Sequence, residues 1–177
     1  MKHRILGFLL LCLAALCSPL AQANDVPVFT PNVVDETGTL SQDDKAAINA
    51  AIQTIRQRAG IWGAVLIVER LQGDTIESLA VNALNTWGLG QRGVDNGLLL
   101  VLALKDRKSR FEVGYGLEGV ITDAVARRAL DDELAPRMRQ GQFKDAIIAS
   151  FYSLAFRVSG QEIRESSLPV PAPAPEP

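Results

Sequence analysis

Two long apolar segments constrain the fold of this chain more than any other feature. Ile61 to Val68 is apolar except for Gly63, and every residue from Leu98 to Leu104 is apolar. Strands have this composition when both faces of their sheet are covered. The segment from Ser109 to Gly114 alternates apolar and polar residues, which predicts a less buried strand that forms a hairpin with the strand before it.

Helical periodicity surrounds these strands, with apolar residues three and four positions apart. Four helices are predicted. The first begins at Ser41 and ends at Gly60, and the second covers Ile76 to Trp87. The third begins at Thr122 and ends at Pro136 or Gly141, and the fourth covers Phe143 to Val158. Residues 24–40 are predicted as an extended lead-in that contains two prolines. This order predicts an α/β fold, a three-layer α/β/α sandwich in which a small mixed sheet carries helices on both faces.

The first 23 residues have the pattern of a secretory signal peptide. Lys2 to Arg4 is basic, Ile5 to Leu16 is apolar, and Ala21 and Ala23 are the small residues that a signal peptidase reads. Twelve apolar residues are too few to span a bilayer. We therefore expect cleavage after Ala23 and a periplasmic or secreted protein.

Cleavage would remove His3, Cys12 and Cys17, the only imidazole and the only thiols of the chain. Their loss excludes a Ser-His-Asp triad, a cysteine nucleophile, a disulfide framework and an ordinary zinc site. The mature chain would keep all 20 acidic and 16 of the 18 basic residues, a formal net charge of about −4. It has no basic stripe with aromatic residues, so we expect no nucleic-acid partner. It also has no second apolar run long enough to predict a transmembrane segment.

The rest of the chain divides into two parts. Residues 24–163 contain all predicted helices and strands and form the folded domain. Residues 164–177 are predicted as a disordered tail, because five prolines alternate between Leu168 and Pro177 and such a segment forms no packed core.

Two glycine loops, Gly88–Gly97 and Gly114–Gly119, contain the G-x-G-x-x-G pattern of dinucleotide sites, the first at Gly88, Gly90 and Gly93. The first follows a helix and precedes a strand, which is the reverse of the required order. The second is not followed by a further strand, so no βαβ unit forms. Glycines that permit tight loops explain the pattern better.

The predicted hairpin places these two loops at the same end of the sheet. Asp95 and Asn96 would then lie close to Glu118 and to Asp123 at the start of the third helix, while Asp132 would approach only if that helix folds back. Such an oxygen-rich cluster suits Ca²⁺ or Mg²⁺. The same residues also have structural interpretations, as a common turn sequence and as a favourable charge at a helix N-terminus.

At these loops the sequence resembles the TPM domain family, also called the TPM phosphatase domain. The matching stretches are Val33–Ser41, Trp87–Gly90, Asp95–Gly97, Glu112–Gly119 and Thr122–Asp123, within a match that covers about residues 30 to 160. The resemblance implies an α/β/α sandwich. The family includes bacterial envelope proteins, some of which bind calcium. It also includes a thylakoid lumen protein that takes part in photosystem II repair and is described as an acid phosphatase.

The resemblance implies that the functional residues of the family correspond to Asp95, Asn96, Glu118 and Asp123, followed by Asp132 and Arg128. Asp35 also matches the family pattern, with a structural role in the N-terminal turn as the alternative. Two functions follow as hypotheses. The favoured one is an exported module that binds a divalent cation, Ca²⁺ or Mg²⁺, and assists an envelope or membrane protein. The alternative is a metal-assisted acid phosphatase that acts on phosphate monoesters, with metal-bound water in place of a side-chain nucleophile.

Overall fold

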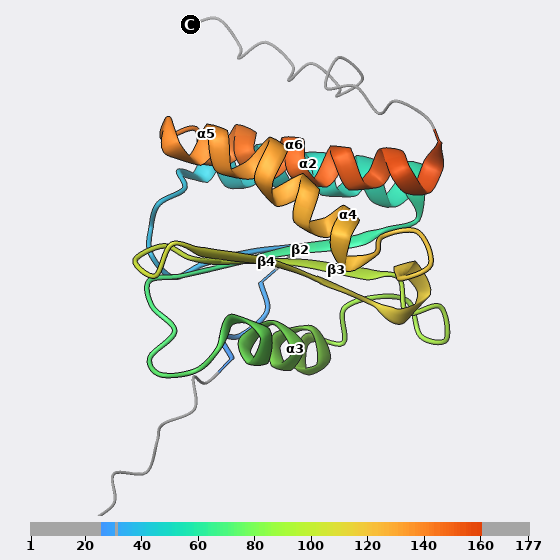
Figure 1. Cartoon of the computed structure of the whole chain (residues 1–177), viewed down its shortest axis with the longest axis horizontal. Helices are drawn as coiled ribbons and strands as arrows, with labels where there is room; N and C mark the ends of the chain where they lie inside the picture. The colour runs from blue at the N-terminus through green and yellow to red at the C-terminus, as the bar shows by residue number, and fades with distance from the viewer. Residues whose placement is uncertain (1–25, 31, 161–177) are drawn as a thin grey trace, which may run out of the picture.

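The computed structural model describes residues 26–30 and 32–160 (Figure 1). The predicted signal peptide, residues 1–23, and the predicted tail, residues 164–177, lie outside these ranges. None of the helices in the described ranges is long and apolar enough to cross a membrane.

A four-stranded mixed sheet forms the middle layer. Its strands are β1 (Val33–Asp35), β2 (Trp62–Val68), β3 (Gly97–Ala103) and β4 (Lys108–Val113), in that spatial order. The first three strands are parallel, whereas β4 runs antiparallel to β3. The mixed sheet and the hairpin are therefore confirmed.

The sequence did not predict strand β1, because residues 24–40 were expected to form only an extended segment. The strand is three residues long and has no periodicity of its own. It exists because it pairs with the second half of β2, with Val33 opposite Val65 and Asp35 opposite Ile67.

Helices cover both faces of the sheet, as Figure 1 shows. Helix α3 (Ile76–Trp87) packs on one face, where it meets side chains of β2 and β3 such as Leu66 and Val101. The other face carries α2, α4, η2, α5 and α6, which span Gln42–Ala59, Asp123–Arg128, Ala129–Leu134, Ala135–Arg139 and Phe143–Ser159. Val65 and Ile67 point into this second layer of the core. The predicted three-layer sandwich is confirmed.

The ends of the first helix follow the predicted signals. Ser41 caps α2 in a capping box, in which its side chain accepts the Asp44 N–H and the Asp44 carboxylate accepts the Ser41 N–H. Gly60 ends the helix in the left-handed conformation, with φ of 70°.

The third predicted helix is longer and less regular than a single α-helix. Thr122 caps its start, and a π-helical turn, η2, separates α4 from α5. Pro136 lies in the first turn of α5, where a proline is tolerated, so the helix ends near Gly141 and not at the proline.

Candidate functional site

The two glycine loops meet backbone to backbone at one end of the sheet. The Gly116 N–H donates to the carbonyl oxygen of Asp95 over 3.0 Å, and the Gly114 N–H donates to that of Gly97 over 2.8 Å. A Cβ atom at Gly116 would collide with the carbonyl oxygen of Val94. Glycine is therefore required for this close approach, and the predicted convergence of the loops is confirmed.

Asn96 shapes the first loop from within. Its side chain is only 8% exposed. The Oδ1 atom accepts the Gln91 N–H over 2.7 Å, and the Nδ2 atom donates to the Gly60 carbonyl over 2.6 Å. Both ends of the amide thus join the loop to itself and to the end of α2. A cation at Oδ1 would compete with the Gln91 N–H, so Asn96 serves first as a clamp.

Asp95 lies beside Asn96 but faces a different environment. It is exposed, and its backbone adopts a left-handed conformation with φ of 53°. It borders a shallow hollow of about 440 Å³ between the end of α3 and Tyr115, which Arg92 also lines.

Glu118 and Asp123 share a second hollow, on the β4 side of the loops. This Glu118 hollow has a volume of about 360 Å³. Its lining residues are Arg110, Phe111, Glu112, Val113, Glu118, Ile121, Thr122 and Asp123. Three of its side chains are acidic and one is basic. The Arg110 Nε lies 2.9 Å from the Glu112 carboxylate, whereas Glu118 and Asp123 form no ion pair with any of the described residues.

The carboxylates that the predicted topology places at one end of the sheet do not form one cluster in the structure. Asp95 borders one hollow, whereas Glu118 and Asp123 line another. Asp132 and Arg128 are exposed on η2 and α4 and line neither hollow. Within residues 26–30 and 32–160, no three acidic, histidine or cysteine side chains are close enough to hold one metal ion together.

Asp35 serves the N-terminal turn. Its buried carboxylate accepts the N–H groups of Thr37, Gly38 and Leu40 over 2.9 to 3.1 Å and lies 3.7 Å from the Lys45 ammonium. Burial alone would raise the pKa of Asp35, but the N–H and hydroxyl donors and the lysine charge outweigh it and hold the pKa below its ordinary value.

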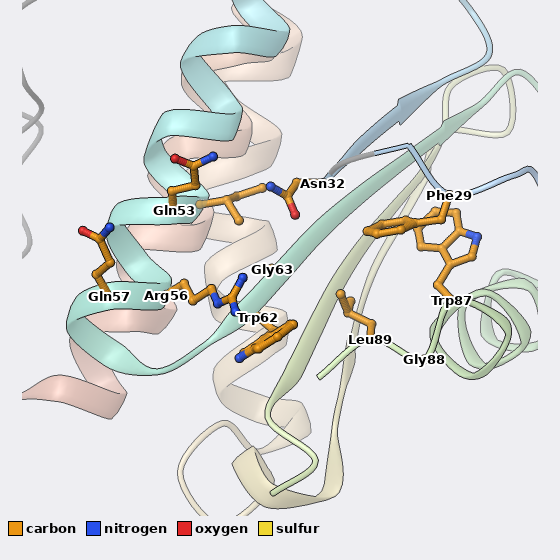
Figure 2. A pocket seen from close by; sticks show the side chains of 11 residues that line it. Phe29, Asn32, Gln53, Arg56, Gln57, Trp62, Gly63, Trp87, Gly88 and Leu89 are labelled. Carbon is orange, nitrogen blue, oxygen red and sulfur yellow. The ribbon is translucent and has the colours of Figure 1, made fainter. Parts of the chain in front are cut away.

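Sequence reasoning missed a third and larger hollow at the same end of the sheet, shown in Figure 2. This aromatic groove, of about 700 Å³, lies along the start of β2, between α2 and the segment before β1. Its lining residues are Phe29, Asn32, Ile52, Gln53, Arg56, Gln57, Trp62, Gly63, Trp87, Gly88 and Leu89. A tryptophan at the first position of an otherwise aliphatic strand is the sequence signal that points to it.

Two tryptophans and their partners form the walls of the aromatic groove. The Arg56 guanidinium lies 3.5 Å from the ring centroid of Trp62, a cation–π contact between α2 and β2. Phe29 packs on Trp87 with ring centroids 5.0 Å apart. Trp87 and Leu89 belong to the same stretch that matches the TPM family pattern.

Comparison with known proteins identifies the domain. The family model described as the TPM domain matches residues 33–155. None of the curated proteins compared with the chain matches it. Among solved structures, the N-terminal domain of a protein from P. gingivalis is similar, with 31% identity, a TM-score of 0.66, and coverage of 74% of this chain and 83% of that chain.

Two more distant structures share the fold. The N-terminal domain of cg2496 from Corynebacterium glutamicum has 22% identity and a TM-score of 0.60, over 84% of this chain and 92% of that one. The BA42 protein of Bizionia argentinensis has 16% identity and a TM-score of 0.59, over 68% of this chain and 82% of that one. The family match spans nearly all the described residues, and the chain therefore belongs to the TPM domain family.

Proposed function

We propose that this TPM-domain protein is an exported module that binds Ca²⁺ or Mg²⁺ at the joined glycine loops and assists a protein of the cell envelope. The observation that carries the proposal is the hydrogen bond from the Gly116 N–H to the Asp95 carbonyl. It fixes the backbone that bears Asp95 against the backbone that bears Glu118.

The donor chemistry of the two loops fits a hard cation. Glu118 and Asp123 line the same hollow, and both side chains are exposed and able to change rotamer. Carboxylates and backbone carbonyls are the ligands that calcium prefers. Like charges at this end repel one another in the free protein, so a bound cation would also stabilise the fold.

Calorimetric titration with Ca²⁺ and with Mg²⁺ tests the cation site. The expected dissociation constant is about 0.1 to 1 mM, the range of extracellular calcium modules. Glu118→Gln and Asp123→Asn should each weaken binding about tenfold, since each removes one anionic ligand. Asp132→Asn is the matched control on η2, outside the Glu118 hollow, and should bind as the parent protein does. Equal binding by all variants would place the cation elsewhere.

A metal-assisted phosphatase is the second candidate function, favoured by one observation. Arg110 lines the Glu118 hollow together with the two proposed cation ligands, and its guanidinium would have to leave Glu112 to bind a phosphate. The described residues contain no histidine or cysteine, and metal-bound water would have to act as the nucleophile. Cation-dependent hydrolysis of an aryl phosphate that is lost in Arg110→Gln and Glu118→Gln would favour the enzyme. Cation binding without hydrolysis would favour the module.

A further inference from the structure

The aromatic groove lies where β1 leaves the edge of β2 uncovered. Residues Trp62 to Ala64 pair with β3 on one side, but β1 begins only opposite Val65. The Val65 N–H donates to the Asn32 carbonyl on the open side. Backbone groups alternate in direction along a strand, so the N–H and C=O of Gly63, two residues before Val65, also point to the β1 side of β2. The strand β1 does not reach Gly63, and these groups face the groove that Gly63 lines.

The lining of the groove selects the chemistry of its occupant. Trp62, Trp87 and Phe29 offer aromatic faces, while amide side chains offer donors and acceptors. Arg56 is charged, and none of the residues that line the groove is acidic. Grooves lined by aromatic residues bind extended proline-rich segments, which lose little entropy on binding because they are already extended. A proline-rich segment with a negative charge matches this surface.

The chain already packs a short segment that contains a proline against Trp87. The indole N–H of Trp87 donates to the carbonyl oxygen of Pro27 over 2.9 Å, within the sequence Val26-Pro27-Val28. Within the described residues, the indole N–H of Trp62 has no comparable acceptor. Trp62 is half-buried in the opposite wall of the groove.

We propose that the proline-rich segment Leu168–Pro177 of this chain binds in its own aromatic groove, against Trp62 and Arg56. The segment begins Leu-Pro-Val-Pro, a sequence similar to the Val-Pro-Val that packs on Trp87. Its one charged residue is Glu176, opposite in sign to Arg56. The proposal is independent of the cation site.

The path of the chain permits this contact. Helices α2 and α6 lie side by side and end at the same end of the molecule, so the end of α6 lies near the last turn of α2, which bears Arg56 and Gln57 (Figure 1). The seven residues 161–167 can span up to about 23 Å in extended form. A segment held in a surface groove adds nothing to the core, so the domain folds without it.

Tryptophan fluorescence tests the proposal directly, because the chain has two tryptophans and both line the groove. The protein from Asn24 to Pro177 is compared with a variant of the same length that carries Pro169→Gly, Pro171→Gly and Pro173→Gly. Short flexible linkers give effective concentrations in the millimolar range, so a segment with a dissociation constant of about 1 mM is docked about half the time. The variant should show a red-shifted emission and a quenching constant for acrylamide about 1.5 times larger than the parent protein.

A peptide of residues 165–177, which contains no aromatic residue, should restore the emission of the proline variant saturably. Arg56→Gln should weaken this response, whereas Arg58→Gln, in the same turn but outside the groove, should leave it unchanged. Equal quenching of parent and variant, with no response to the peptide, would overturn the proposal. Loss of protection in the parent protein on about hundredfold dilution would also overturn it, because the occupant would then be a second copy.

Discussion

Asn96→Ala tests whether Asn96 holds the first glycine loop as a clamp. The substitution removes the acceptor of the Gln91 N–H and the donor to the Gly60 carbonyl. It leaves the backbone of Asn96 in place, including the carbonyl that accepts the Trp62 N–H over 2.9 Å. The loss is therefore confined to two side-chain hydrogen bonds, one within the loop and one from the loop to the end of α2.

The magnitude follows from these two bonds. Each intramolecular hydrogen bond contributes about 0.5 to 1.5 kcal/mol, and a partner left unsatisfied costs more where water cannot reach it. Gln91 and Gly60 are exposed residues, so water can replace part of what is lost. We expect the free energy of unfolding to fall by about 2 kcal/mol, and the melting temperature of a domain of this size to fall by about 6 to 8 °C.

Urea unfolding followed by circular dichroism measures this change without added cation. Asn96→Asp keeps an acceptor for the Gln91 N–H but turns a carboxylate oxygen toward the Gly60 carbonyl, and this buried contact between two acceptors should make its loss at pH 7 at least as large as that of Asn96→Ala. A free energy of unfolding for Asn96→Ala within about 0.5 kcal/mol of the parent value, the range of ordinary surface substitutions, would refute the clamp. Weaker cation binding alone would then identify Asn96 as a ligand.

Three further predictions concern other parts of the chain. Because the pKa of Asp35 is lowered in the folded state, its carboxylate stabilises the fold at neutral pH, and this contribution is lost as the pH falls through the folded-state pKa. Asp35→Asn should therefore be less stable than the parent protein at pH 7, by about 1 to 3 kcal/mol. Its urea midpoint should also depend less on pH below about 5 than that of the parent protein. Gly116→Ala should cost about 1 to 3 kcal/mol by forcing the loops apart, whereas Gly119→Ala, with open space around its Cβ position, should stay within about 0.5 kcal/mol in thermal unfolding. N-terminal sequencing of the exported protein should find a start at Asn24, and a start at Met1 would contradict the signal peptide.

Much of the fold could be predicted from local sequence signals. The apolar runs of β2 and β3 require two covering layers, and Ser41 with Asp44 marks a helix start that forms as a capping box. Strand β1 could not be predicted in this way, because three residues carry no period and the strand depends on its pairing with β2. The π-helical turn at Ala129–Leu134 likewise has no recognisable pattern in the sequence.

The candidate site was predictable at the level of the backbone and not of the side chains. Hairpin topology alone brings Asp95 and Glu118 to one end of the sheet. The hollow that each side chain borders depends on the left-handed backbone at Asp95 and on the turn at Gly114–Gly119. The aromatic groove depends on where β1 stops and on how Phe29 packs, and neither can be read from spacing.

A calcium titration followed by amide chemical shifts tests the central claim, a cation held at the joined glycine loops, most directly. We expect saturable shifts confined to residues 94–97 and 114–123, which belong to the two loops and the start of α4. Glu118→Gln should reduce the affinity without moving the shifts to other residues. About 10 mM Ca²⁺ is ten times the weakest dissociation constant typical of extracellular calcium modules. No shift at this concentration, or shifts centred elsewhere on the domain, would mean that the glycine loops do not hold the cation.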